Sequence, residues 1–81
     1  MSNSKIETTI GLCVVALTRH IMELQNLDYE SAYKKLLTMD LYQLLTDSET
    51  RLFLEPNSFL CKACEKELSE GKDALYKFIK E

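Results

Sequence analysis

The chain has 81 residues, 46% apolar and 28% charged, with a net charge of −3 at pH 7. This composition excludes a disordered chain, and the length suits one domain with a single apolar core, residues 1–81. The even spread of acidic and basic residues excludes the basic field that phosphate-backbone binding needs. Because two glycines and one proline leave few positions for tight turns, we predict an all-α fold: a compact bundle of four to five helices with a long, centrally packed first helix.

The sequence shows neither a membrane span nor a signal peptide. Its longest apolar run, Leu12 to Leu17, is far shorter than the about 20 residues that a spanning helix needs. The first five residues are not followed by the apolar stretch and cleavage site of a signal peptide. We therefore expect a cytoplasmic protein without membrane contact, in which the three cysteines stay reduced.

The first predicted helix, from Ser4 to Gln25, is apolar on two sides. One row of residues repeats at alternating spacings of four and three: Ile6, Ile10, Cys13, Leu17, His20 and Leu24. A second row lies on a different side: Gly11, Val15, Thr18 and Met22, with Leu12 beside it. Either the other helices wrap both sides, or the second row meets a partner. Gly11 interrupts the pattern and favours the close approach of another backbone at that point, or is simply tolerated.

The second and third predicted helices are short. Asp28 is placed as the N-cap of a helix from Tyr29 to about Thr38. Its inner face should hold Tyr29, Ala32, Tyr33 and Leu36, and its outer face Glu30, Ser31, Lys34 and Lys35. Asp40 and Gln43 resemble a capping box that opens the third helix, which continues through Leu45.

The last third of the chain predicts two more helices. Residues 50–55 fit either a buried extended segment or a helical turn. Pro56 then begins a helix to about Leu68, with Gly71 suited to end it. This helix should bury Phe59, Leu60, Ala63, Cys64 and Leu68. Residues 73–80 form the final helix, with Leu75, Phe78 and Ile79 facing inward.

One motif, Cys61-Lys62-Ala63-Cys64, places two thiols on the same side of a helix, which suits a metal or a redox pair. A structural zinc site needs four ligands, and only Cys13 and His20 add further Cys or His side chains. These two are about 10 Å apart along the first helix, too far to meet at one ion. We therefore interpret Cys61 and Cys64 as structural thiols. A metal- or redox-linked regulator remains the alternative, and the sequence does not place Cys13 or His20 relative to the motif.

Catalysis, cofactor binding and DNA binding are not expected. His20 has no nucleophile or orienting group placed beside it by sequence, and the carboxylates are scattered. The second and third helices have the layout of a helix-turn-helix. However, Gln43 is the only usual base-reading side chain of the third helix, and Asp40 and Asp47 stand at its two ends. Nucleic acid and small molecules are therefore not predicted partners, and a DNA-binding accessory protein is a further alternative.

Residues 27–59 resemble a group of small all-helical bacterial proteins whose function is not established. The resemblance lies in an apolar opening helix and in two segments, Leu-Asp-Tyr-Glu-Ser-Ala-Tyr at 27–33 and Leu-Tyr-Gln-Leu-Leu at 41–45. Members are often encoded beside toxin-like genes, so the resemblance implies an accessory or antitoxin-like binding role. This chain reads Thr-Arg-Leu-Phe-Leu at 50–54, where the group is expected to have a histidine, and no functional residue carries over.

The sequence therefore predicts a small helical protein–protein interaction module without catalytic activity. Its expected partner is another protein or its own copy, in a homodimer or a hetero-complex. The predicted interface is the second row of the first helix: Gly11, Leu12, Val15, Thr18 and Met22.

Overall fold

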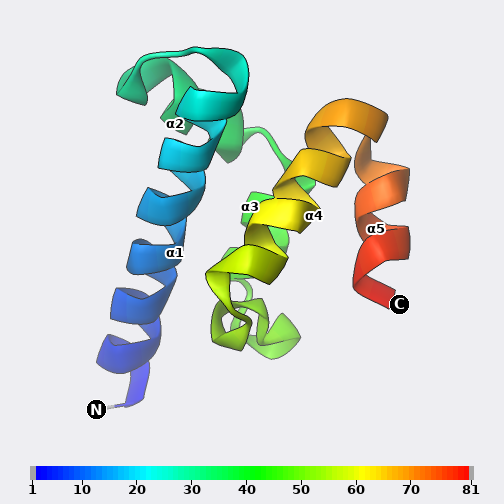
Figure 1. The fold of residues 1–81 in the computed structure, drawn as a ribbon. Coiled ribbons are helices and arrows are strands. Elements are labelled where there is room, and N and C mark those ends of the chain that lie inside the picture. Colours follow the sequence, from blue (N-terminus) through cyan, green and yellow to red (C-terminus); the bar gives the residue numbers. More distant parts are fainter. Residues whose placement is uncertain (1, 81) are drawn as a thin grey trace.

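The structure, a computed structural model, describes residues 2–80. Within this range the chain forms five α-helices and two single-turn 3₁₀ helices, and no strand (Figure 1). Their bounds are α1 Ser2–Gln25, α2 Tyr29–Leu37, α3 Asp40–Thr46, η1 Ser48–Thr50, η2 Leu52–Leu54, α4 Asn57–Glu70 and α5 Lys72–Lys80. The predicted all-α bundle with a long first helix is confirmed. None of its described helices is both long and apolar enough to span a bilayer.

The two longest helices, α1 and α4, run in the same direction and contact each other (Figure 1). α2 packs on α1, α3 lies behind α4, and α5 returns along α4 on the side away from α1. The core between them takes side chains from all five helices and from η2: Cys13, Leu17, Ile21, Ala32, Leu36, Met39, Leu41, Leu45, Leu52, Phe53, Leu60, Ala63, Cys64 and Leu75. The predicted inward residues of the last two helices all belong to this core or pack against it.

Two helix ends follow the sequence signals. The Asp28 carboxylate accepts a hydrogen bond from the Ser31 backbone N–H at 2.8 Å, so Asp28 is the N-cap of α2 as predicted. This bond holds the pKa of Asp28 below its usual value. At the end of α4, Gly71 has φ +95°, a conformation that a residue with a Cβ rarely adopts.

The start of α3 differs from its prediction. Met39 occupies the N-cap position without a side-chain cap, and the predicted box between Asp40 and Gln43 does not form. Instead, Glu67 of α4 supplies the cap: its two carboxylate oxygens accept from the backbone N–H groups of Asp40 and Leu41 at 2.8 and 2.9 Å. Asp40 is already inside the helix, and its carboxylate accepts from the Tyr76 hydroxyl of α5 at 3.1 Å. One cluster therefore ties three helices together.

The exposed side of α2 also departs from the prediction. Ala32 and Leu36 are buried as expected, but Tyr29 and Tyr33 are 46% and 37% exposed, so their predicted inward position is wrong. The two rings stack on each other one turn apart, with centroids 6.5 Å apart and planes at 9°. A nine-residue helix that meets α1 along a narrow stripe buries only the residues on that stripe, and the tyrosines lie beside it.

Residues 50–55 form a helical turn rather than an extended segment. The two short helices η1 and η2 meet at Arg51, which has a left-handed backbone (φ +57°). Leu52 and Phe53 enter the core, whereas Leu54 stays exposed. The sharp bend at Arg51 turns the chain from α3 into α4, and this favours the helical turn over the extended segment.

Candidate interaction surface

The inner and outer sides of α1 differ in burial. Cys13, Leu17 and Ile21 are at most 6% exposed. By contrast, Leu12, directly before Cys13, is 68% exposed, and Val15, two residues after Cys13, is 38% exposed. The contacts that α1 makes with α2, α3, α4 and η2 therefore cover one side of the helix only. We call Gly11, Leu12 and Val15 the outward face of α1.

The five residues predicted as an interface are divided between surface and core. Gly11, Leu12 and Val15 are exposed. Thr18 is fully buried, with its hydroxyl donating to the Val14 carbonyl at 2.7 Å. Met22 is half-buried against the core. Both positions lie nearer to the buried stripe than their spacing from Gly11 suggested, so they serve the chain's own packing and leave three residues for a partner.

A shallow groove of about 380 Å³ runs beside the outward face, between α1, α2 and α3. Its lining is mostly apolar and aromatic: Glu7, Ile10, Gly11, Val14, Tyr33, Tyr42 and Thr46. Apart from its chain neighbours and the backbone of its own helix, no atom lies within 4 Å of the place where a Cβ on Gly11 would be. Among the described residues, the close backbone approach expected at Gly11 is therefore absent, and the space in front of it is open. Tyr33 lines this groove although its spacing predicted a core position, because a tyrosine at that spacing also suits a surface, where its hydroxyl reaches water.

His20 contacts a carboxylate of α4. Its Nε2 lies 2.8 Å from the Glu65 carboxylate, and this contact joins α1 to α4. The imidazole is partly exposed at the rim of the bundle. Within residues 2–80, no group of three or more His, Cys, Asp or Glu side chains is arranged to hold a metal ion.

The three cysteines are free thiols that differ in burial. Cys13 and Cys64 are buried, and Cys61 is half-buried. Burial raises the pKa of all three thiols, and it raises the pKa of Cys64 from 9.0 to about 12. The raised pKa keeps the thiols protonated at neutral pH, which disfavours thiolate-based redox exchange. The alternative of a metal- or redox-linked regulator therefore gains no support from the geometry.

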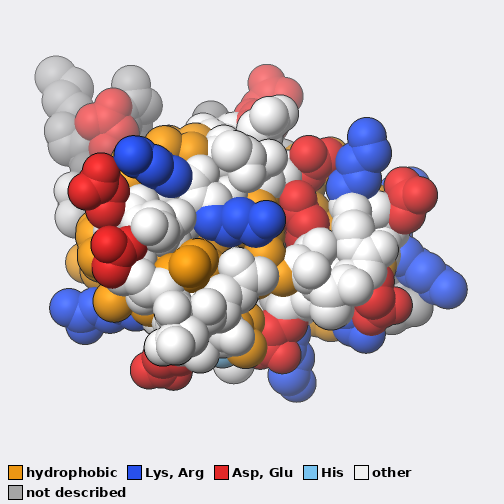
Figure 2. All heavy atoms as spheres, turned by 90° about the horizontal axis from the view of Figure 1, so that it is seen from above, with side chains coloured by type: hydrophobic (Ala, Val, Ile, Leu, Met, Phe, Trp, Pro, Cys, Tyr) orange, Lys and Arg blue, Asp and Glu red, His pale blue; other side chains and the backbone are white. Residues whose placement is uncertain are grey.

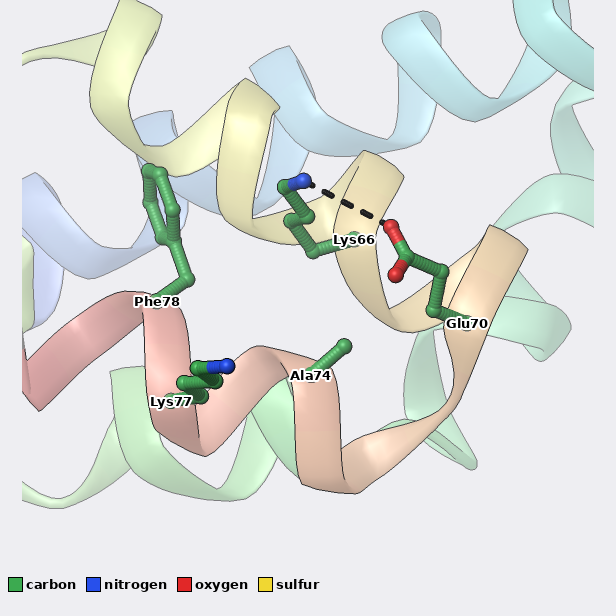
Figure 3. A pocket seen from close by; sticks show the side chains of 5 residues that line it. All are labelled: Lys66, Glu70, Ala74, Lys77 and Phe78. Atoms are coloured by element: carbon green, nitrogen blue, oxygen red, sulfur yellow. Dashed lines mark hydrogen bonds and ion pairs between the residues drawn. The ribbon is translucent and has the colours of Figure 1, made fainter.

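The face of the bundle seen from above is mixed in charge (Figure 2). Viewed along the bundle from above, acidic and basic side chains alternate, with small apolar areas between them (Figure 2). A pocket of about 210 Å³ between α4 and α5 is bordered by the exposed Lys66–Glu70 pair, 3.5 Å apart, and by Lys77, Ala74 and Phe78 (Figure 3). On this face the mixture provides no field of one sign for a phosphate backbone.

Comparison with known protein families, with characterised proteins and with solved structures finds no match to this chain. Functional inference for this protein therefore starts from its own surface.

Proposed function

We propose that this protein is a small helical interaction module that pairs with a second copy of itself through the outward face of α1 and carries out no catalysis. The observation that carries the proposal is the exposure of Leu12, 68%, in the middle of a 24-residue helix, with Val15 beside it on the next turn. Burying one leucine side chain stabilises an association by about 1.5–3 kcal/mol. An apolar stripe on a long, regular helix is a surface that another helix covers well.

A second copy is the simplest partner for this face. In a two-fold dimer the same patch is buried twice, so each apolar residue contributes two contacts. The residues that flank Leu12 and Val15 are small: Gly11 has no side chain and open space before it, and the side chain of Ala16 ends at its Cβ. Small flanking residues let two helix backbones approach closely.

The test is the oligomeric state of Leu12→Glu against a matched control, Leu24→Glu. Leu24 is also an exposed leucine of α1, at 47%, but it borders a pocket shared with α4 rather than the outward face. Sedimentation velocity from 5 to 500 µM (about two decades of concentration, chosen to span weak dimers) should give a dimer for the wild type and for Leu24→Glu, and a monomer for Leu12→Glu. A wild type that stays monomeric throughout, or a Leu12→Glu variant that still dimerises, would overturn the proposal.

A further inference from the structure

The exposed side of α1 carries a regular seam beyond its two apolar residues. Alternating spacings of three and four, the repeat of a coiled-coil contact, connect one row of residues on this side. The row reads Lys5, Thr8, Leu12, Val15, Arg19 and Met22. All but Met22 are exposed, and Glu23 lies beside Met22 at the same end. The seam is therefore apolar at its centre and charged toward both ends.

The two ends carry different sets of charges, a cation near the start and a cation with an anion near the end. Lys5 stands near the start of the seam, whereas Arg19 and Glu23 stand near its end. In the described part of the chain, none of these three side chains takes part in an ion pair. A parallel pairing of two copies in register would place Lys5 against Lys5 and Glu23 against Glu23. An antiparallel pairing would place Lys5 against Glu23 twice.

We propose that the dimer is antiparallel, with its two-fold axis between Leu12 and Val15, and that Lys5 of each copy pairs with Glu23 of the other. This inference rests on the proposed self-association and adds its orientation. With the axis at that point, Leu12 meets the second copy's Val15, and Gly11 lies opposite the second copy's Ala16. Two small residues thus face each other on both sides of the apolar centre, and the open space at Gly11 admits the second helix.

Charge reversal separates the two orientations. Lys5→Glu and Glu23→Lys should each raise the dimer dissociation constant, by about three- to tenfold at low salt, since attraction becomes repulsion at two symmetric places. The double variant K5E/E23K restores both pairs and should return to near the wild-type value. In a parallel dimer, each single change only replaces one like-charge contact with another, so all three variants would match the wild type and overturn the inference.

A loss of helical structure in α1 would not explain a higher dissociation constant in either single variant. An acidic residue near the start of a helix and a basic residue near its end both favour the helix dipole. Each single change therefore supports α1 in the monomer while opposing the dimer. Circular dichroism of the variants should be unchanged, and the differences in dissociation constant should shrink in high salt.

A distance between spin labels tests the same orientation independently of charge. With Gln25→Cys labelled in a Cys61→Ser background, the two labels lie at opposite ends of an antiparallel dimer, about 35 Å apart along the helices. In a parallel dimer they lie side by side, within about 20 Å. A short distance overturns the antiparallel orientation and leaves self-association standing. The absence of any intermolecular distance, together with a monomeric mass, overturns the proposed function itself.

Discussion

The two longest helices, α1 and α4, differ in how completely their apolar side chains are covered. α4 is contacted by α1 and α3 and, on the side away from α1, by α5, where the rings of Phe59 and Phe78 have centroids 5.1 Å apart. α1 is contacted by four elements, yet Leu12 and Val15 remain exposed. Neighbouring helices lie on both flanks of α4, whereas the contacts of α1 cover one of its sides. An apolar sequence pattern therefore indicates which side chains favour burial. The fold decides whether the same chain buries them or leaves them exposed to a partner.

The largest effect should distinguish a covered leucine from an uncovered one. Leu60 of α4 is 1% exposed, and Leu60→Ala should lower the free energy of unfolding by about 2–5 kcal/mol, because it leaves a cavity in the core. Leu12→Ala on α1 should change it by less than about 0.5 kcal/mol in the monomer. Urea unfolding at a protein concentration below the dimer dissociation constant measures both. Comparable losses in the two variants would mean that α1 is covered within the monomer.

The second effect concerns the capping of α3 by Glu67, a side chain of α4. Glu67→Gln removes one of two acceptors, and the charge, from the N-terminus of α3 and should cost about 1–2 kcal/mol. Glu70→Gln, one turn further along α4, only breaks an exposed pair with Lys66 and should cost less than about 0.5 kcal/mol. Urea unfolding gives the two free energies, and faster amide exchange at Asp40 and Leu41 should accompany Glu67→Gln alone. Equal costs would contradict a capping role for Glu67.

The sequence predicts local features of this fold better than long-range ones. The N-cap at Asp28 and the helix end at Gly71 depend on a few neighbouring residues, and both could be predicted. The cap from Glu67 could not, because it acts across 26 and 27 residues and a glutamate on a helix surface has no special sequence signal.

The same distinction applies to the candidate site. Spacing alone identified a second apolar row on α1, including Leu12 and Val15. It also included Thr18, which the structure buries, because the width of the buried stripe depends on how α2 and α4 lie against α1. Tyr33 was misplaced for the same reason.

The pH dependence of the free energy of unfolding should show how far the fold shields the Cys64 thiol of α4 from water. Burial raises the pKa of Cys64 from 9.0 to about 12, so in this interval the unfolded chain loses a proton that the folded chain keeps. The contribution of Cys64 to stability is therefore complete below pH 9 and is lost as the pH rises toward 12. Between pH 8 and pH 10 the wild type should lose about 1 kcal/mol more than Cys64→Ala, as measured by urea unfolding. Parallel losses in the two proteins would mean that the Cys64 thiol is as well solvated in the fold as in the unfolded chain.

The smallest effect compares the chain's two glycines, one within α1 and one at the end of α4. Gly11→Ala should raise the free energy of unfolding by about 0.5–1 kcal/mol, because alanine favours the helix and its Cβ would meet no atom within 4 Å. Gly71→Ala should lower it by about 1 kcal/mol, since φ +95° is strained for any residue with a Cβ, although the space there is equally open. Thermal unfolding of dilute protein should show melting temperatures that move in opposite directions. A loss of stability in Gly11→Ala would mean that α1 meets a close neighbour there, and its dependence on protein concentration would tell a second copy from the chain itself. Gly11 weakens its own helix and has open space before it in the monomer, and the approach of a second helix best explains such a glycine. The two glycine variants therefore test whether the monomer leaves at Gly11 the space that the dimer requires.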